Sequence, residues 1–320
     1  MAGRISIVVA SLILEGLKKS APDVLAAHAV DVNEVLAAGE EGAPLEPYRR
    51  ILRDVHVSAG GAAILRAGES LRGLAHPLLF VLLNSDAPRI LIEKEARLAA
   101  FFHSRHRVVI DEESPNALLL RHVSDHGAPE ATDSLASCGQ HIVLLEEIGC
   151  RPLRLRLPAS DDPDRVVYDA GRFEEPASGA TSTWHFEWGA FQPTRKPMAG
   201  LDAILLGSSP DRALDDELGP AARVEAVVRR DLGRTWKLAE VAEALGTSSR
   251  SLQRTLGAAG LKYSELLDRI RNEEAARLLS DSDLSITEIG YVCGFADTAH
   301  FSRSFKKRHE KTPSAFRSAR

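Results

Sequence analysis

Apolar residues near the C-terminus recur at helical spacing. Ile286, Ile289 and Cys293 stand at positions i, i+3 and i+7, which predicts a short amphipathic helix. Ser285 and Glu288 begin it with an S-x-x-E capping box, in which the hydroxyl accepts from one backbone N–H and the carboxylate from another. The helix is therefore expected to start at Ile286.

The residues after this helix predict a tight turn and a second helix. Gly294 ends the first apolar pattern, where a left-handed cap is needed, and Asp297 can cap the next helix. Phe301 and Phe305 lie one helical turn apart and would face the core. The other face is polar and carries Thr298, His300, Ser302, Arg303 and Lys306. A short helix, a glycine turn and a polar-faced second helix are typical of a helix-turn-helix, so we expect this face to contact DNA.

The same pattern occurs once earlier in the chain. The positions that align with the later copy are Leu238, Val241, Leu245, Gly246, Leu252 and Leu256. Between the copies, the apolar residues of Tyr263–Leu279 keep to one helical stripe, which predicts a single connecting helix. About 15 helical residues rise roughly 22 Å, and the width of the flanking units would bring two recognition helices about one DNA turn, ~34 Å, apart. If this spacing is slightly short, bound DNA must bend.

The first two thirds of the chain change from helical to strand patterns near residue 107. Helical periodicity predicts Ile5–Lys18, Ala21–Ala38 (interrupted at Pro22), Pro47–Val55, Ala62–Leu83 and Leu91–His106. Alternation then predicts strands at Arg107–Asp111, Ala117–Val123, Arg151–Leu157, Val166–Tyr168 and Thr181–Phe191, with helices at Leu135–Ile148 and Leu201–Leu206. We expect an α+β domain over residues 1–206 and a polar linker over 207–220. An all-α DNA-binding domain over 221–320 would follow, with two helix-turn-helix units bridged by a long helix.

Charge is distributed unevenly along the 320 residues. The formal net charge of −5 by itself disfavours nucleic-acid binding, but residues 221–320 hold 18 Lys and Arg against 13 Asp and Glu. The rest of the chain is acidic, with 22 basic against 32 acidic residues. A basic cluster lies at the end of this C-terminal part: Lys306, Lys307, Arg308 and Lys311. Such a cluster alone is usually a solvated surface, but beside a recognition helix it is expected to contact phosphates.

Four stretches of the C-terminal part carry a specific set of motifs. They are L-x-x-V-A-x-x-L-G-x-S-x-R-x-L-Q-R (Leu238–Arg254), R-x-x-x-A-x-x-L-L (Arg271–Leu279), I-x-x-I-x-x-x-x-G-F-x-D-x-x-x-F-S-R-x-F-K (Ile286–Lys306) and T-P-S-A-F-R (Thr312–Arg317). Together they resemble the DNA-binding domain of the AraC/XylS family of bacterial transcription regulators. The resemblance implies a sequence-specific regulator or activator that binds double-stranded DNA, with RNA polymerase as a partner.

The resemblance also implies roles for individual residues. Those expected at base edges are Arg250, Gln253 and Arg254 on the first recognition helix and Thr298, Ala299, Ser302 and Arg303 on the second. Those expected at phosphates are Ser249, His300, Lys306, Lys307, Arg308 and Lys311. The chemistry agrees, because Arg pairs bidentately with guanine and Gln with adenine in the major groove.

Two residues depart from the family pattern. Gly290 stands where the family usually has Ala, which should cost about 1 kcal/mol of helix stability. Glu310 stands where a Gly commonly ends the second recognition helix, so this turn needs another solution. Both bear on how firmly the second unit is held and leave its DNA-reading face unchanged.

The front part resembles the helix-rich ligand-binding domain of some AraC-family members. The resemblance rests on its order of elements and on L-x-x-I-G-C-R-P (Leu145–Pro152). Such domains sense small molecules and form dimers, so we expect an effector and a homodimer. Trp184, His185 and Trp188 are candidates for an effector pocket, with core packing of the strand as the simpler interpretation.

Other classes of function have less support in the sequence. The cysteines Cys138, Cys150 and Cys293 share no C-x-x-C spacing, so we expect no disulfide, no metal site and a cytoplasmic location. No apolar run is long enough for a membrane span, and no nucleophile or nucleotide-binding motif indicates an enzyme or a cofactor. Two alternatives stay open: a regulator that senses only a protein partner, and a redox or enzymatic N-terminal domain with accessory DNA binding, for which Cys138 and Cys150 would be the thiol pair.

Overall fold

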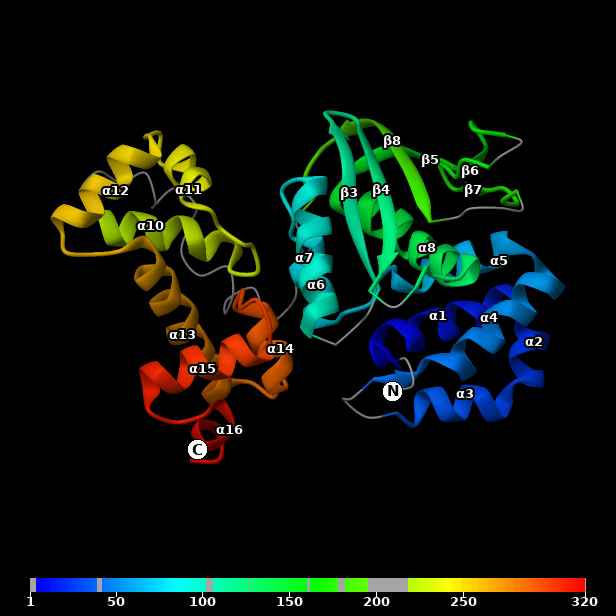
Figure 1. Ribbon diagram of the computed structural model, residues 1–320, viewed down its shortest axis with the longest axis horizontal. Coiled ribbons are helices and arrows are strands. Elements are labelled where there is room, and N and C mark those ends of the chain that lie inside the picture. Colours follow the sequence, from blue (N-terminus) through cyan, green and yellow to red (C-terminus); the bar gives the residue numbers. More distant parts are fainter. Residues whose placement is uncertain are drawn as a thin grey trace. The chain divides into compact units, whose positions relative to one another are not determined.

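The computed structural model describes residues 4–38, 42–101, 106–125, 127–159, 162–177, 182–194 and 218–319 (Figure 1). These fall into two compact units. The N-terminal unit lies within Met1–Leu74 and Leu82–Arg195, and the C-terminal unit lies within Ala75–Val81 and Lys196–Arg320. A short piece of the front half therefore packs with the C-terminal unit, which periodicity gave no reason to expect.

The N-terminal unit begins with helices, as predicted. Their bounds are Ile7–Ser20 (α1), Pro22–Ala27 (α2), Ala29–Leu36 (α3), Leu45–Ala59 (α4), Gly61–Ala67 (α5), Pro77–Leu83 (α6) and Pro88–Phe101 (α7), with a 3-10 turn at Gly68–Leu71 (η1). The first residues of α6 belong to the C-terminal unit. Two short strands, Arg4–Ile5 (β1) and Ala43–Pro44 (β2), pair beside α1 and α4. Pro22 separates α1 from α2, because proline suits the first turn of a helix and not its interior.

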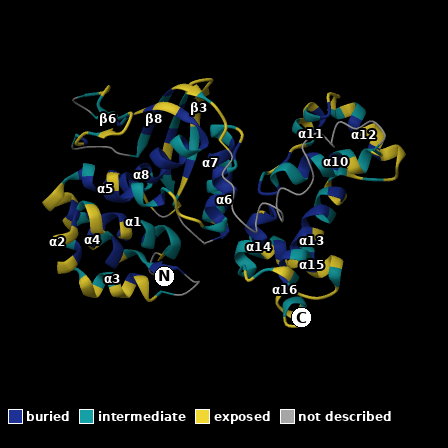
Figure 2. Cartoon of the chain, turned by 180° about the vertical axis from the view of Figure 1, so that it is seen from behind, coloured by how far each residue is buried: buried dark blue, intermediate teal, exposed yellow. Residues whose placement is uncertain are grey.

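An antiparallel sheet follows in the order β3-β4-β8-β5-β6-β7. Its strands are His106–Ser114 (β3), Ala117–Ser124 (β4), Cys150–Arg156 (β5), Val166–Asp169 (β6), Arg172–Phe173 (β7) and Thr183–Phe191 (β8). Helix Ala131–Ile148 (α8) contacts β5 and also α5, η1 and α4, and most of its residues are buried (Figure 2). The core of this unit thus surrounds α8, between the sheet and the first helices.

The sequence prediction was wrong at the start of β3. The helix expected over Leu91–His106 ends at Phe101 within the described residues, and His106 instead pairs with Ser124 as the first residue of a β3–β4 hairpin. Pairing between strands overrides helical periodicity here, because the hairpin continues the β-ladder back to His106. The short strand β7 was also missed. The helix expected at Leu201–Leu206 and most of the linker 207–220 lie outside the described residues, so the domain boundaries stay a prediction.

The C-terminal unit is helical in the described residues beyond Gly219. Its helices are Pro220–Val228 (α10), Leu238–Ala244 (α11), Ser249–Ala258 (α12), Tyr263–Asp281 (α13), Ile286–Val292 (α14), Thr298–His309 (α15) and Pro313–Arg317 (α16), with a 3-10 turn at Arg229–Asp231 (η3). The predicted fold class is confirmed: an α+β N-terminal part with an antiparallel sheet, followed by an all-helical part with a long helix between two helix pairs.

Candidate nucleic-acid interface

The first helix pair, α11 and α12, has a local signal for each of its boundaries. Glu240 Oε2 accepts from the backbone N–H of Lys237 at 2.8 Å at the start of α11. Gly246 takes a left-handed φ of 64° after it, a conformation that costs glycine no side-chain clash. Ser248 then caps α12 by accepting from the backbone N–H of Ser251 at 3.2 Å. These local contacts mark where α11 begins and ends and where α12 begins.

The second pair, α14 and α15, repeats these devices. The capping box forms as predicted, with Ser285 Oγ accepting from Glu288 N at 3.1 Å and Glu288 Oε2 accepting from Ser285 N at 2.8 Å. Gly294 has φ 79°, and Asp297 Oδ1 accepts from His300 N at 2.6 Å to cap α15. Both pairs are therefore helix-turn-helix units with the boundaries that the sequence predicts.

The turns of the two units close with equivalent hydrogen bonds. Thr247 N donates to Ala242 O at 2.9 Å in the first unit, and Phe295 N donates to Gly290 O at 3.1 Å in the second. Gly290 is thus the counterpart of Ala242, as the repeat alignment requires. Since both turns share one hydrogen-bond pattern, the internal repeat in the sequence is a repeat in the structure.

Helix α13 connects the two units and packs against both. Leu266 and Ile270, in its first half, belong to the buried cluster formed with α10, α11 and α12. Ala275, Leu278 and Leu279, in its second half, are buried near α14. In Figure 1 the first unit lies at one end of α13 and the second unit at the other. Its 19 residues correspond to roughly 28 Å of helix rise.

Polar contacts join α13 to η3, before the first helix-turn-helix unit, and to α15 of the second unit. Arg229 donates from Nη1 to Glu274 Oε2 at 2.9 Å, and the side chain of Glu274 is only 4 % exposed. Asn272 Nδ2 donates to Ser304 Oγ on α15 at 2.8 Å. Breaking a buried charge pair leaves an uncompensated charge, so such contacts restrict α13 to one arrangement. Sequence analysis did not identify these four residues as structural links.

The turn of the second unit also lies directly against the first. A Cβ atom built on Gly294 would stand 2.2 Å from the carbonyl oxygen of Leu232, and Leu232 belongs to the buried cluster of the first unit. The glycine is required twice, because its φ is left-handed and because the backbone of Leu232 approaches so closely. The equivalent Gly246 has open space around it.

The residues expected to read bases on the first unit share the outer face of α12. Arg250, Gln253 and Arg254 are all exposed, while Leu252 and Leu256 on the opposite face are buried. The spacing of three and four residues brings the exposed side chains to one side of the helix. In the described part of the chain, neither Arg250 nor Arg254 has an ion-pair partner. Both guanidinium groups are therefore available to an external acceptor.

On the second unit, the expected base-reading residues lie on α15. Ala299, Ser302 and Arg303 are exposed, and Thr298, in the first turn, is partly exposed. The opposite face carries the buried Phe301, whose ring centroid lies 4.8 Å from that of Phe295 in a tilted pair and 5.7 Å from that of Phe305 in an edge-to-face pair. As far as the described residues extend, Arg303 has no intramolecular ion pair.

The expected phosphate contacts divide into two groups. The side chains of Lys306, Lys307 and Lys311 are exposed and have no ion-pair partner among the described residues. The others are engaged or less accessible. Arg308 contacts Glu273 Oε1 at 3.3 Å, His300 accepts from Ala296 N at 3.4 Å, and Ser249 is only partly exposed. A phosphate would have to compete with Glu273 for Arg308, so the three lysines are the better candidates.

Glu310 solves the turn after α15 without a glycine. It adopts φ 60° and ψ 0° in the left-handed region, and its backbone N–H donates to Lys306 O at 2.9 Å. A non-glycine residue in this conformation costs about 1–2 kcal/mol. The turn that needed a solution other than glycine is thus formed by a strained left-handed cap. Lys306 and Lys307 remain in the last turn of α15.

The effector candidates lie in or beside the core of the N-terminal unit. Trp184 is fully buried, with its ring centroid 5.6 Å from that of His122 and 5.2 Å from that of His141. Trp188 is also buried, whereas His185 is bonded to Arg156 on the other face at 2.8 Å. None of the three candidates lines the cavity enclosed by α1, α4, α7, α8 and β3, which is described below.

The thiols of this unit are poorly placed for redox sensing. Cys138 and Cys150 are both free and buried. Burial raises the pKa of Cys150 to about 12 and raises that of Cys138 well above its usual value. Since the thiolate is the reactive form, both groups are unreactive near neutral pH in this fold. Within the described residues, no group of three or more His, Cys, Asp and Glu side chains could hold a metal ion, and no helix is long and apolar enough to cross a membrane.

Comparison with known proteins supports the assignment of the C-terminal unit. A family model described as a helix-turn-helix domain matches residues 241–319. The ornithine utilization regulator of Pseudomonas aeruginosa is 30% identical over 156 residues, which cover 47% of this chain and 44% of that protein. The urease operon transcriptional activator of Escherichia coli is 34% identical over 91 residues, covering 28% and 31%. This chain spans less than half the length of these curated relatives.

One solved structure is also similar to part of this chain. The crystal structure of the DNA-binding domain of AdpA in complex with a target DNA is 27% identical, covers 32% of this chain and 93% of its own, and has a TM-score of 0.29. The matches to these three proteins thus cover from 28% to 47% of this chain.

Proposed function

We propose that this chain, which belongs to the AraC/XylS family through its C-terminal helix-turn-helix domain, regulates transcription by binding DNA with both of its helix-turn-helix units. One observation supports this most directly. Two units with equivalent turns are joined by one helix, and their outer faces carry Arg250, Arg254 and Arg303, which have no ion-pair partner among the described residues. Solvated, unpaired guanidinium groups on a recognition helix are suited to guanine O6 and N7.

The geometry of α13 favours two boxes on one face of the duplex. Roughly 28 Å of helix rise falls a little short of the ~34 Å of one DNA turn, and the widths of α12 and α15 add to it. The contacts of Glu274, Asn272 and Gly294 hold both units on this helix. A rigid spacer fixes the distance between the boxes, and DNA bending would absorb what mismatch remains.

We assign base reading and phosphate binding to different side chains. Arg250, Gln253 and Arg254 on α12, and Thr298, Ala299, Ser302 and Arg303 on α15, would read bases. Ser249, His300, Lys306, Lys307, Arg308 and Lys311 would contact phosphates, with the three free lysines contributing most. The base contacts would supply specificity, at about 1–3 kcal/mol for each good bidentate pair. The phosphate contacts would supply affinity that falls with salt concentration.

The N-terminal unit is assigned the control of this binding. We infer that it takes a small-molecule effector, holds two chains together as a homodimer and acts in the cytoplasm, with RNA polymerase as the partner at the promoter. An effector acts only if its affinity differs between DNA-competent and DNA-incompetent states. Control by a protein partner alone is the alternative, and the buried thiols disfavour redox control.

The test is selection of genomic DNA fragments by the purified full-length protein at low and high salt. Fragments that share two short boxes about one turn apart are expected. A selected fragment is then altered by inserting half a turn, about 5 base pairs, between its boxes, and a fragment with one box serves as the control. The insertion should lower affinity to that of the single box. Affinity unchanged by the insertion, or recovery of unrelated fragments at both salt concentrations, would contradict the proposal.

A further inference from the structure

A cavity in the N-terminal unit is lined by segments that are distant in the sequence. Val9 of α1, Tyr48 of α4, Leu98 of α7, Val108 of β3 and Ala136 of α8 contribute to its wall. The centre of a water-sized sphere can move through about 80 Å³ of it. One water needs roughly 10–15 Å³ on this measure, so there is room for more than a single water, as a small-molecule site requires. The wall is mostly apolar, with a few polar groups, and this composition is also typical of such sites.

Two carboxyl groups of the wall present oxygens without partners. Oε2 of Glu95, on α7, and Oδ1 of Asp133, on α8, are shielded from solvent and accept no hydrogen bond from the described residues. Buried acceptors of this kind are uncommon in native proteins and need an explanation. A carboxylate oxygen can only accept, so a matching ligand must bring donors.

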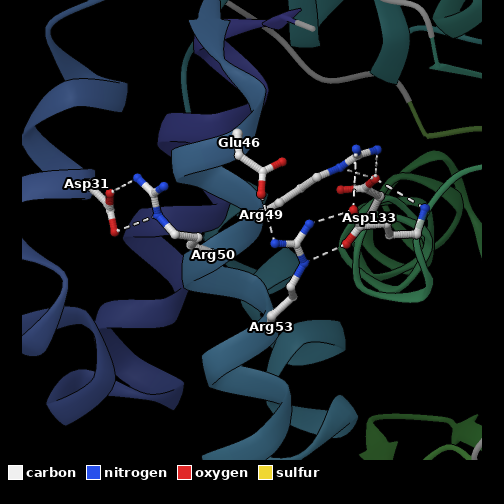
Figure 3. Close-up of polar contacts among 7 residues, drawn as sticks. Asp31, Glu46, Arg49, Arg50, Arg53 and Asp133 are labelled. Carbon is white, nitrogen blue, oxygen red and sulfur yellow. Dashed lines mark hydrogen bonds and ion pairs between the residues drawn. The ribbon is translucent and has the colours of Figure 1, made fainter. Parts of the chain in front are cut away.

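The two carboxylate oxygens of Asp133 differ in their hydrogen bonding. Its Oδ2 accepts from Arg49 Nε at 2.9 Å, from Arg49 Nη2 at 2.5 Å and from the backbone N–H of Glu130 at 3.3 Å (Figure 3). Arg53 supports this arrangement by donating to Glu130 at 2.9 and 2.7 Å. Arg49 balances the charge of Asp133, which lines the cavity, while Oδ1 accepts no hydrogen bond from the described residues.

The other ionisable groups of the wall carry no charge or are already compensated. Burial lowers the pKa of His106 and lowers that of His122 to about 3, so both rings are neutral near pH 7. Burial also raises the pKa of Tyr48, which stays protonated. Arg107 is paired with Asp125. Among the described lining residues, this leaves Glu95 as the group whose charge has no balancing partner.

The state of Glu95 agrees with this account. Burial raises the pKa of its carboxyl group to about 7, because desolvation disfavours the ionised form and no described residue offsets this effect. A bound cation would favour ionisation and would displace the proton to solvent. An anionic ligand would be repelled by the ionised carboxylate of Glu95, so we expect it not to bind.

We propose that this cavity is the effector site and that its ligand is a small molecule with one protonated amino group on a mainly apolar body. The ammonium group donates to Glu95 Oε2 and Asp133 Oδ1, and the body lies against the apolar wall formed by α1, α7 and α8. The inference rests on the proposed function, because it names the class of effector that the N-terminal unit would sense. It replaces Trp184, His185 and Trp188 as the effector contacts.

The experiment measures calorimetric binding of three matched probes to the full-length protein. These are 2-phenylethylamine, 2-phenylethanol and 3-phenylpropanoate, which share an aromatic body and differ in the polar end. The amine should bind at least about ten-fold more tightly than the alcohol, since a hydrogen bond to a charged group is stronger than a neutral one. The carboxylate should not bind. Equal binding of amine and alcohol would overturn the assignment of ligand class.

Glu95→Gln tests the site, with Glu112→Gln as the control that removes the same charge from an exposed position of β3. Glu95→Gln should lose the preference for the amine, and Glu112→Gln should keep it. Proton release from the unaltered protein gives a second readout, independent of how the variant folds. Amine binding near pH 7, in buffers of different ionisation enthalpy, should displace up to one proton per chain. Preference kept in Glu95→Gln, or no proton released, would overturn the proposal.

DNA affinity is measured separately on a selected two-box fragment, with and without the amine. Normal DNA binding together with no binding of any amine probe would contradict this inference and leave the proposed function standing. Amine binding by a protein that selects no DNA sequence would contradict the proposed function instead.

Discussion

Asn272 on α13 and Ser304 on α15 form a buried contact between the connecting helix and the second recognition helix. Asn272 Nδ2 donates to Ser304 Oγ at 2.8 Å and also to Asp268 O, within its own helix, at 2.7 Å. Asn272 is 1 % exposed. With both amide hydrogens engaged, the side chain has one favourable orientation, so the pair sets where α15 lies along α13.

Replacing Asn272 by Ala should weaken the second unit more than the first. The substitution removes both hydrogen bonds and leaves a small cavity, which together should cost about 1–3 kcal/mol of unfolding free energy. Denaturant unfolding measures this cost, and DNA fragments that carry only one box report on each unit. Binding to the box of the second unit should fall, while binding to the box of the first unit should change little.

The matched control for this prediction is Ser304→Ala. It removes only the contact between the helices, because Asn272 keeps its bond to Asp268. Its effect on stability should be smaller and its effect on DNA should have the same direction. Equal losses at both boxes would show that Asn272 stabilises the whole C-terminal unit and does not position α15 in particular.

The two turn glycines should differ in their tolerance of a side chain. Gly246 has φ 64° with no atom within 4 Å of an added Cβ, so Gly246→Ala should cost only the left-handed strain of about 1–2 kcal/mol. Gly294→Ala adds a contact of 2.2 Å with the carbonyl oxygen of Leu232, which the backbone must move to relieve. Its cost should be larger, about 3 kcal/mol or more. Thermal unfolding of both variants measures the difference, and equal costs would mean that Leu232 does not contact this turn in solution.

Both helix-turn-helix units could be predicted from sequence because their signals are local. The capping box of Ser285 and Glu288, the glycine at 294 and the cap at Asp297 each act within four residues of the backbone group they satisfy. The end of α7 could not be predicted in this way. His106 becomes a strand residue through its pairing with Ser124, and periodicity contains no information about a partner strand.

The cavity was missed for a related reason, although one signal was present. Its wall comes from α1, α4, α7, α8 and β3, and no short stretch of sequence shows that these segments meet. Glu95, however, follows Leu91 by four residues and precedes Ala99 by four, and this places a charged residue on the apolar face of the predicted helix Leu91–His106. An acidic residue on such a face indicates a buried polar site. Aromatic residues of a core strand, such as Trp184, are a weaker indication of a ligand site, because they also occur in ordinary cores.

The N-terminal unit should lose stability as the pH falls below about 6.5. Burial lowers the pKa of His122 to about 3 and that of His141 to about 4, so both stay neutral in the fold while the unfolded chain takes up protons. A lowered histidine pKa gives stability that is complete above the unfolded value and is lost as the pH falls toward the folded value. Each ring should contribute a slope of up to about 1.4 kcal/mol per pH unit in this window.

Denaturant unfolding at pH 7, 6 and 5 measures this slope. His122→Gln should flatten it while keeping a hydrogen bond to Ser134, which His122 Nδ1 contacts at 2.9 Å. His56→Gln, at an exposed position of α4, is the control and should leave the slope unchanged. The buried carboxyl of Glu95, with its pKa raised to about 7, contributes a slope of opposite sign, so the comparison between variants decides. A slope equal in His122→Gln and in the unaltered protein would show that His122 is not buried as a neutral ring.

Arg254 and Lys307 should affect DNA binding in different ways, although each substitution removes one positive charge. Arg254 lies on the outer face of α12, where its planar guanidinium group can bond to one base, so Arg254→Ala should relax preference at one position of the first box by about 1–3 kcal/mol. Lys307 lies in the last turn of α15, where we expect its ammonium group to contact phosphates of the DNA backbone. Lys307→Ala should weaken binding to every sequence and lower the magnitude of the slope of log K against log salt by about 1. Lys19→Ala, on α1 of the N-terminal unit, controls for the loss of charge itself and should change neither quantity. If Arg254→Ala and Lys307→Ala gave the same profile over a panel of single-base variants, α12 would be bound to phosphates and base reading would have to come from another face.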